Sequence, residues 1–245
     1  MNRYGWIPDL PDYRDRIYRA TVDEEAALPP AVDLRAGCSP VEDQGDLGSC
    51  TANAIVGVLE YDEERDGDFV DLSRLFLYYE ERKIEHTINY DSGAMIRDGI
   101  KVAAKTGVPP ETDWPYDISK FTDKPPIIAY RDAALHKITR YSRVLGLNSV
   151  KASIANKLPV AFGFTVYESF ESDATTKTGI VTMPGPDERV LGGHAICAVG
   201  YDDGHQWIII RNSWGTSWGD AGYGYMPYDY IRNANLSDDF WQVQK

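Results

Sequence analysis

The chain has 245 residues, of which 43% are hydrophobic and 26% are charged, close to the averages of globular proteins. Disordered, fibrous and coiled-coil proteins are therefore excluded. The 25 Lys and Arg residues against 38 Asp and Glu give a formal net charge of −13, which argues against binding to nucleic acid or to an anionic membrane surface. No apolar run reaches the roughly 18 residues of a membrane-spanning helix.

The three cysteines, Cys38, Cys50 and Cys197, leave one thiol over from any pairing, so we expect no disulfide framework. The sequence has no clustered Cys and His ligands, and it predicts neither a metal site nor another cofactor. The first ten residues are polar and contain no apolar signal core. We therefore expect a monomer that is cytoplasmic or released without a visible signal peptide.

Residues 1–27 differ from the rest of the chain in composition and in hydrophobic pattern. The stretch YGWIPDLPDYRDRIY contains two prolines and several Asp and Arg residues, without a helical or strand period. We predict an extended N-terminal extension over residues 1–27, followed by a single larger unit over residues 28–245.

Three helices are predicted in the first half of this unit. The first begins after Ser49 and is apolar nearly all round (CTANAIVGVLEY), which indicates a buried helix, and Gly57 within it suggests a close packing contact. The second covers LSRLFLYYEERK and is capped by Ser73. The third runs from about Gly93 to Thr106 and is ended by Gly107.

From about residue 130 onward, short runs rich in β-branched and aromatic residues predict strands. These runs are HKITRYSRV, PVAFGFTV, GIVTM, HAICAVGY, QWIIIRNS and GYGYMPY, with one short helix over SVKASIANKL. Helices followed by strands predict an α+β fold with a helical lobe over roughly 28–130, a β-rich lobe over roughly 131–245 and a cleft between them.

Three patches together predict covalent acyl transfer. Cys50 lies at the start of the buried helix, where the helix dipole lowers the pKa of a thiol, and Gln44 in the same patch offers an amide toward an oxyanion. His194 opens a predicted strand after Gly193, and Asn212 could orient its imidazole. These residues supply the nucleophile, the base and the orienting group that such a reaction needs.

Over roughly Leu28 to Tyr225 the sequence resembles the papain-like cysteine peptidases. The resemblance rests on the stretch LPPAVDLR at its start, on LGSC, on WPY, on the GHA that precedes VGY, and on NSWG with a second Trp at Trp218. It implies the papain-like fold, with a barrel-like C-terminal lobe and the active site in the cleft. It also implies that Cys50 is the nucleophile, that His194 is its base and later acid, and that Asn212 holds the imidazole.

The same resemblance implies which residues line the substrate groove. Gln44 and the backbone N–H of Cys50 would form the oxyanion hole, and Met95 and Ile96 would line the pocket for the residue second from the scissile bond on its acyl side (the S2 pocket). The substrate-binding residues implied are Gly48, Ser49, Gly93, Ala94, Met95, Ile96, Gly193 and Trp214. We therefore expect a cysteine endopeptidase that acts on peptides or proteins and prefers an apolar residue in the S2 pocket.

Two departures place the chain in a divergent, disulfide-free branch similar to the papain-like peptidases of microbes. Leu47 stands where the family usually has Cys, and Thr51 where it usually has Trp. Two other functions stay open. A peptide-binding pseudo-enzyme is disfavoured by the intact catalytic positions. Among related acyl-transfer enzymes, Asn212 disfavours a transglutaminase, whereas a peptide ligase would carry the same site residues.

The role of the N-terminal extension has two interpretations. It is either a short inhibitory pro-segment, with Trp6, Ile7 and Leu10 along the substrate groove, or an extension packed on the back of a lobe. Its mixed apolar and proline content suits both.

Overall fold

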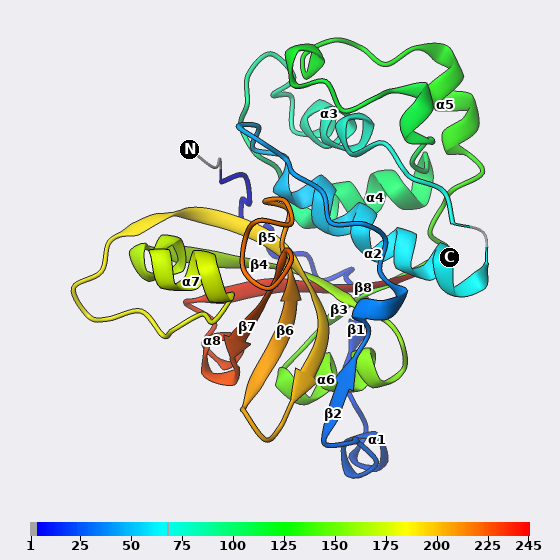
Figure 1. Ribbon diagram of the computed structural model, residues 1–245. Helices are drawn as coiled ribbons and strands as arrows, with labels where there is room; N and C mark the ends of the chain where they lie inside the picture. Colours follow the sequence, from blue (N-terminus) through cyan, green and yellow to red (C-terminus); the bar gives the residue numbers. More distant parts are fainter. Residues whose placement is uncertain (1–3, 68) are drawn as a thin grey trace.

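The computed structural model describes residues 4–67 and 69–245 and has two lobes (Figure 1). The helices are α1 (Val22–Ala26), α2 (Cys50–Asp66), α3 (Arg74–Ile84), α4 (Ile96–Lys105), α5 (Ile127–Ala133), α6 (Leu147–Ala155), α7 (Asp173–Thr178) and α8 (Tyr228–Arg232). The strands are β1 (Ile17–Tyr18), β2 (Ala31–Asp33), β3 (Arg140–Val144), β4 (Val160–Tyr167), β5 (Val190–Asp202), β6 (Trp207–Arg211), β7 (Tyr223–Pro227) and β8 (Ser237–Gln244). Short 3-10 turns cover Arg35–Gly37, Glu111–Asp113, Ile118–Lys120 and Glu168–Glu171.

Helix α2 is the buried centre of the helical lobe, as its apolar sequence predicts. It begins at Cys50, directly after Ser49, and ends at Asp66. Gly67 follows with a φ of 83°, the left-handed conformation that terminates helices. The Ser49 hydroxyl does not cap the helix. It pairs instead with the Tyr116 hydroxyl, 2.5 Å away.

Gly57 makes the close contact that its place in α2 suggests. A Cβ at this position would lie 2.7 Å from Arg211 Nη1 and 3.5 Å from Cys197 Sγ. The Arg211 side chain is itself buried and donates to Ser39 Oγ at 3.0 Å and to the Pro40 carbonyl.

Gly57→Ala is therefore expected to destabilise the fold by about 1–2 kcal/mol, because overpacking outweighs the gain in helix propensity. The free energy of unfolding in urea measures this effect. Gly185→Ala is the matched control, since a Cβ there would meet nothing closer than 3.5 Å. An unchanged unfolding midpoint in Gly57→Ala would contradict the packing argument.

The second and third predicted helices are confirmed, with one corrected boundary. The Ser73 hydroxyl accepts from the backbone N–H of Phe76 and caps α3. Helix α4 begins only at Ile96, not at Gly93, because Gly93 has a φ of 73° and Ala94 pairs with the N-terminal segment. Gly107, with a φ of 89°, follows the end of α4 as predicted.

The strands form one mixed sheet in the order β1-β3-β8-β4-β5-β6-β7, with β2 paired to β5. Within the described residues this path is open, so the sheet of the second lobe does not close into a barrel. The run GIVTM is not a strand, because Ile180 makes only a single bridge to Tyr225. No strand was predicted over β8, which lies between β3 and β4 in the sheet.

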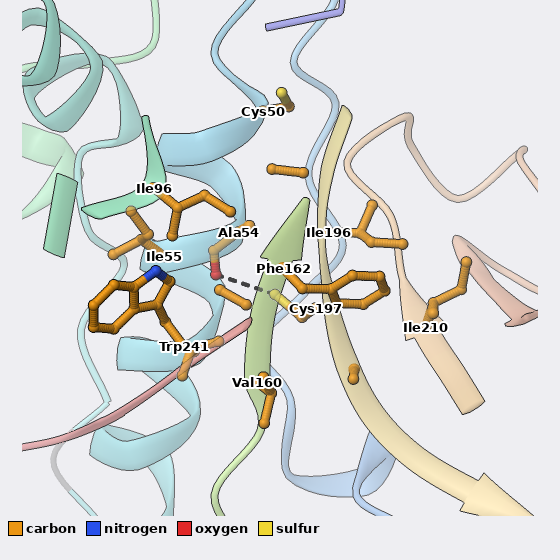
Figure 2. Packing of buried hydrophobic residues seen from close by; sticks show 14 of the residues in the cluster. Cys50, Ala54, Ile55, Ile96, Val160, Phe162, Ile196, Cys197, Ile210 and Trp241 are labelled. Carbon is orange, nitrogen blue, oxygen red and sulfur yellow. Dashed lines mark hydrogen bonds between the residues drawn. The ribbon is translucent and has the colours of Figure 1, made fainter. Parts of the chain in front are cut away.

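The two lobes meet where α2 packs against β5. Figure 2 shows Cys197 of β5 with its thiol directed at α2, where Sγ donates to the Ala54 carbonyl at 3.1 Å. Cys197 therefore packs in the core. The C-terminal end also reaches α2, since the backbone N–H of Lys245 donates to Asp62 at 2.7 Å. The first contact holds the beginning of α2 against the middle of β5, and the second holds the last turns of α2 against the C-terminal end of the chain.

Part of the N-terminal extension belongs to the body of the fold, which corrects the prediction of an extended segment throughout. Strand β1 pairs in parallel with β3. Helix α1 begins with a capping box between Thr21 and Glu24. None of the helices in the described ranges 4–67 and 69–245 is long and apolar enough to cross a bilayer.

Candidate active site

Cys50 is the first residue of α2 and is completely buried. The loop before it is held by the neighbouring chain. The Gly48 N–H donates to the Asp91 carboxylate at 3.1 Å, and the Tyr116 hydroxyl donates to the Gln44 carbonyl at 3.0 Å. The thiol is thus fixed at the positive end of the helix dipole, where the sequence predicts it.

His194 and Asn212 form the predicted pair. His194 Nε2 lies 2.8 Å from Asn212 Oδ1, which also accepts from the Ser213 N–H at 2.8 Å. Because that backbone donor fixes the amide orientation, the imidazole carries its hydrogen on Nε2. Nδ1 is left without a hydrogen-bond partner among the described residues. The Trp214 ring stacks on the imidazole, with centroids 4.8 Å apart and planes at 28°, and covers this bond.

Gln44 is held rigidly beside this pair. Its side-chain amide donates to the Leu47 carbonyl at 2.8 Å and accepts from Ser213 Oγ at 2.6 Å, and its backbone N–H donates to the Ser213 carbonyl at 2.9 Å. The side chain is fully buried. The structure thus brings Gln44, Cys50, His194 and Asn212 together at the junction of the two lobes.

The N-terminal segment crosses the groove beside these residues. Ala94 N–H donates to the Gly5 carbonyl at 2.7 Å, Ile7 N–H donates to the Ala94 carbonyl at 3.0 Å, and Trp6 N–H donates to the Gly193 carbonyl at 3.0 Å. Residues predicted to bind the substrate backbone therefore bind this segment. The bridge between Trp6 and Ala94 is parallel.

Glycines on both walls of the groove leave room for the segment and no more. A Cβ at Gly93 would lie 2.3 Å from the Gly5 carbonyl oxygen, and a Cβ at Gly163 would lie 2.0 Å from the Trp6 ring. The interpretation that places the extension on the back of a lobe is wrong for this segment. Leu10, whose side chain is 67% exposed, does not lie along the groove as predicted.

The covered site is electrically neutral. Burial raises the pKa of Cys50 to about 12, although backbone N–H groups of Ala195 and Gly5 favour the thiolate. Burial also lowers the pKa of His194 to about 4, against the effect of the Asn212 hydrogen bond. At neutral pH the thiol and the imidazole are therefore both uncharged while the segment is in place.

The remaining predicted groove residues have different surroundings. Met95 is half-buried, and its N–H donates to Glu85 at 2.8 Å. Ile96 is fully buried in the core that also contains Ala54 and Ile55 (Figure 2). Its role in the S2 pocket stays a prediction.

Sequence reasoning missed several residues that support the site. The Tyr78 hydroxyl donates to Asp91 and accepts from the Gly93 N–H at 3.0 Å, so Tyr78 and Asp91 link the nucleophile loop to the wall of the groove that carries Gly93. Asp239 accepts from the Trp6 indole N–H at 3.1 Å. No motif marks these residues, because single Tyr and Asp residues are usually surface or packing groups.

Comparison with known proteins agrees with this geometry. The family described as papain family cysteine protease matches residues 28–240. The chain belongs to this family. An uncharacterized peptidase C1-like protein of Acanthamoeba polyphaga mimivirus is 40% identical over 270 residues, covering 99% of this chain and 86% of that protein. Cysteine proteinase 3 of Entamoeba histolytica is 32% identical over 219 residues, covering 87% of this chain and 67% of that protein.

A solved structure extends the likeness to the whole fold. Xylellain, a cysteine protease from Xylella fastidiosa, superimposes with a TM-score of 0.93 at 44% identity and covers 99% of this chain and 96% of its own. The papain-like fold and the assignment to the cysteine protease class of hydrolases, both implied by the sequence motifs, are therefore confirmed.

Proposed function

We propose that this papain-family protease is an endopeptidase that acts through a thioester on Cys50. The observation that carries the proposal is the orientation of His194. Nε2 is bound to Asn212, so Nδ1 is the nitrogen that can take up a proton. Cys50 reaches the same strand, because its sulfur is within hydrogen-bond reach of the N–H of Ala195, the residue that follows His194.

In the open site the Cys50 thiol transfers its proton to His194, and the thiolate attacks the peptide carbonyl carbon. His194 then donates the proton to the leaving amine as the C–N bond breaks, which leaves a thioester. Water, deprotonated by His194, attacks the thioester. The carboxylic acid leaves, and the thiol is restored.

The developing oxyanion would be met by the side-chain amide of Gln44 and the backbone N–H of Cys50. The fixed position of Gln44 supports this role, because a donor that is already oriented costs no reorganisation during the reaction. Incubation with a labelled peptide amine separates hydrolysis from ligation. We expect free carboxylic acid as the product, and incorporation of the amine would instead favour the ligase.

We propose that the S2 pocket prefers an apolar side chain. The Trp6 ring packs against Gly163 in the groove. This contact supports a site that accepts a large apolar side chain.

A positional peptide library tests this preference. We expect aromatic and aliphatic residues to be enriched at the second position on the acyl side. Enrichment of charged residues would overturn the proposed apolar preference of the S2 pocket but would leave the assignment of Cys50 as nucleophile unchanged.

We also propose that the N-terminal segment inhibits the enzyme by covering Cys50. Three backbone hydrogen bonds hold it in the groove, and the neutral thiol and imidazole beneath it support a form without an active ion pair. Removal of the segment is expected to open the groove to substrate and to allow Cys50 and His194 to form the thiolate–imidazolium ion pair.

A further inference from the structure

The N-terminal segment marks both sides of the nucleophile. The Gly5 N–H is within hydrogen-bond reach of the Cys50 sulfur, so Gly5 lies over the reacting atom. Trp6 follows on the wall that carries Gly163, where we place the acyl side of a substrate. Tyr4 precedes Gly5 and lies on the other side of Cys50.

The surroundings of Tyr4 identify this other side as the place of the leaving amine. The centroid of the Tyr4 ring lies 6.3 Å from that of Trp214, and Trp214 covers His194. Because His194 protonates the leaving amine in the proposed mechanism, the substrate residue that carries this amine must lie next to His194. Tyr4 thus occupies the place of the first substrate residue on the leaving-group side.

This place accepts a large side chain. A Cβ at Gly192 would lie 2.6 Å from the Tyr4 ring, so the glycine leaves the room that the ring fills. At the far end of the ring, the Tyr4 hydroxyl donates to Glu171 Oε1. The subsite therefore combines an apolar wall with a carboxylate that only a long side chain can reach.

Glu171 is held in position by its neighbour in the sequence. It is the last residue of the 3-10 turn that follows β4. The buried Phe170 ring of the same turn packs edge-on against Trp214, with centroids 5.5 Å apart, and lies at the same distance from Trp218. The turn that carries Glu171 is therefore fixed relative to the catalytic histidine.

The charge of Glu171 is available to a substrate. The side chain is exposed, and no cation within the described ranges pairs with it. Arg189 is engaged by Glu168 at 2.5 Å, and a further acid on this side, Glu188, accepts from the Ser169 N–H at 2.9 Å. The neighbourhood of Glu171 is therefore negative and attracts a cation.

We propose that Glu171 is a specificity-determining residue that selects Lys or Arg at the first position on the leaving-group side of the scissile bond. The aliphatic part of such a side chain would pack along Gly192 and Trp214, where the Tyr4 ring now lies, and its charged end would meet the carboxylate. This inference rests on the proposed endopeptidase function and names a substrate class for it.

Competition between two peptides tests the inference on the full chain. The peptides differ only at the first position on the leaving-group side, where one has Lys and the other norleucine, and mass spectrometry of the products gives the ratio of their kcat/KM values. Both peptides bind the same open fraction of molecules, so the covering segment does not alter this ratio. We expect the Lys peptide to be preferred about 5-fold, as for an exposed charge pair, and the preference to fall at high salt.

Variants of Glu171 identify the group. Glu171→Gln is expected to abolish the preference for the Lys peptide, and Glu171→Lys to favour a peptide with Glu at the same position over the Lys peptide. Asp173→Asn is the matched control, because Asp173 is an exposed acid at the start of α7, only two residues further on. It is expected to keep the preference. Thermal unfolding checks the fold of each variant.

Equal kcat/KM values for the Lys and norleucine peptides in the unmodified chain would overturn the inference, as would a preference for Lys that persists in Glu171→Gln. Both outcomes require cleavage and leave the proposed function intact. Cleavage of neither peptide, by the full chain and by the chain without residues 1–10, would instead overturn the proposed function and this inference with it.

Discussion

Deletion of residues 1–10 is expected to raise kcat/KM for a fluorogenic peptide by at least ~100-fold. The reason is the small fraction of full-length molecules whose groove is open. An enzyme whose groove is filled by its own chain binds substrate only in the open fraction, and a closed form favoured by about 3 kcal/mol leaves less than ~1% open. The deletion removes the three backbone bonds at Ala94 and Gly193 and also the bonds from the Trp6 indole and the Asp9 N–H to Asp239.

The position of the deletion matters. Removal of residues 1–27 would also delete β1 and α1, which pair with β3 and contact α6, and its effect on activity would be mixed with a loss of stability. The shorter deletion leaves these elements intact, and thermal unfolding checks the fold. Equal kcat/KM for the full and the shortened chain, at equal stability, would refute the inhibitory role.

His194→Ala in the chain that lacks residues 1–10 is expected to lower kcat/KM by at least ~10³-fold, and Cys50→Ala to lower it at least as far. Each variant removes a member of a group that acts as a unit. His205→Ala is the matched control, because that side chain is 62% exposed and contacts its near neighbours Asp202 and Trp207, away from the site. A loss below ~10-fold in His194→Ala would show that another group serves as the base.

The catalytic residues could be predicted from the sequence because each lies in a local pattern with a physical meaning. Cys50 stands at the start of an apolar helix, and His194 and Asn212 lie in or next to neighbouring strands rich in β-branched residues. In the structure β5 pairs with β6, and this pairing brings Asn212 next to His194.

Other features depend on contacts between distant parts of the chain. The predicted helix includes Gly93 and Ala94, yet Gly93 has a left-handed φ of 73° and Ala94 pairs with the N-terminal segment instead. No motif in the sequence marks Asp238 or Asp239. Only the tertiary fold buries Asp239 beneath Trp6, and no local periodicity can reveal that.

The most direct test of a covered, activated nucleophile uses a peptidyl epoxide that alkylates activated thiols, with intact mass and peptide mapping. The chain without residues 1–10 is expected to gain a single adduct, on Cys50, and the full chain is expected to react much more slowly. The adduct is expected to disappear in His194→Ala. An adduct on Cys38 or Cys197 instead, or equal rates in the full and shortened chains, would contradict this account.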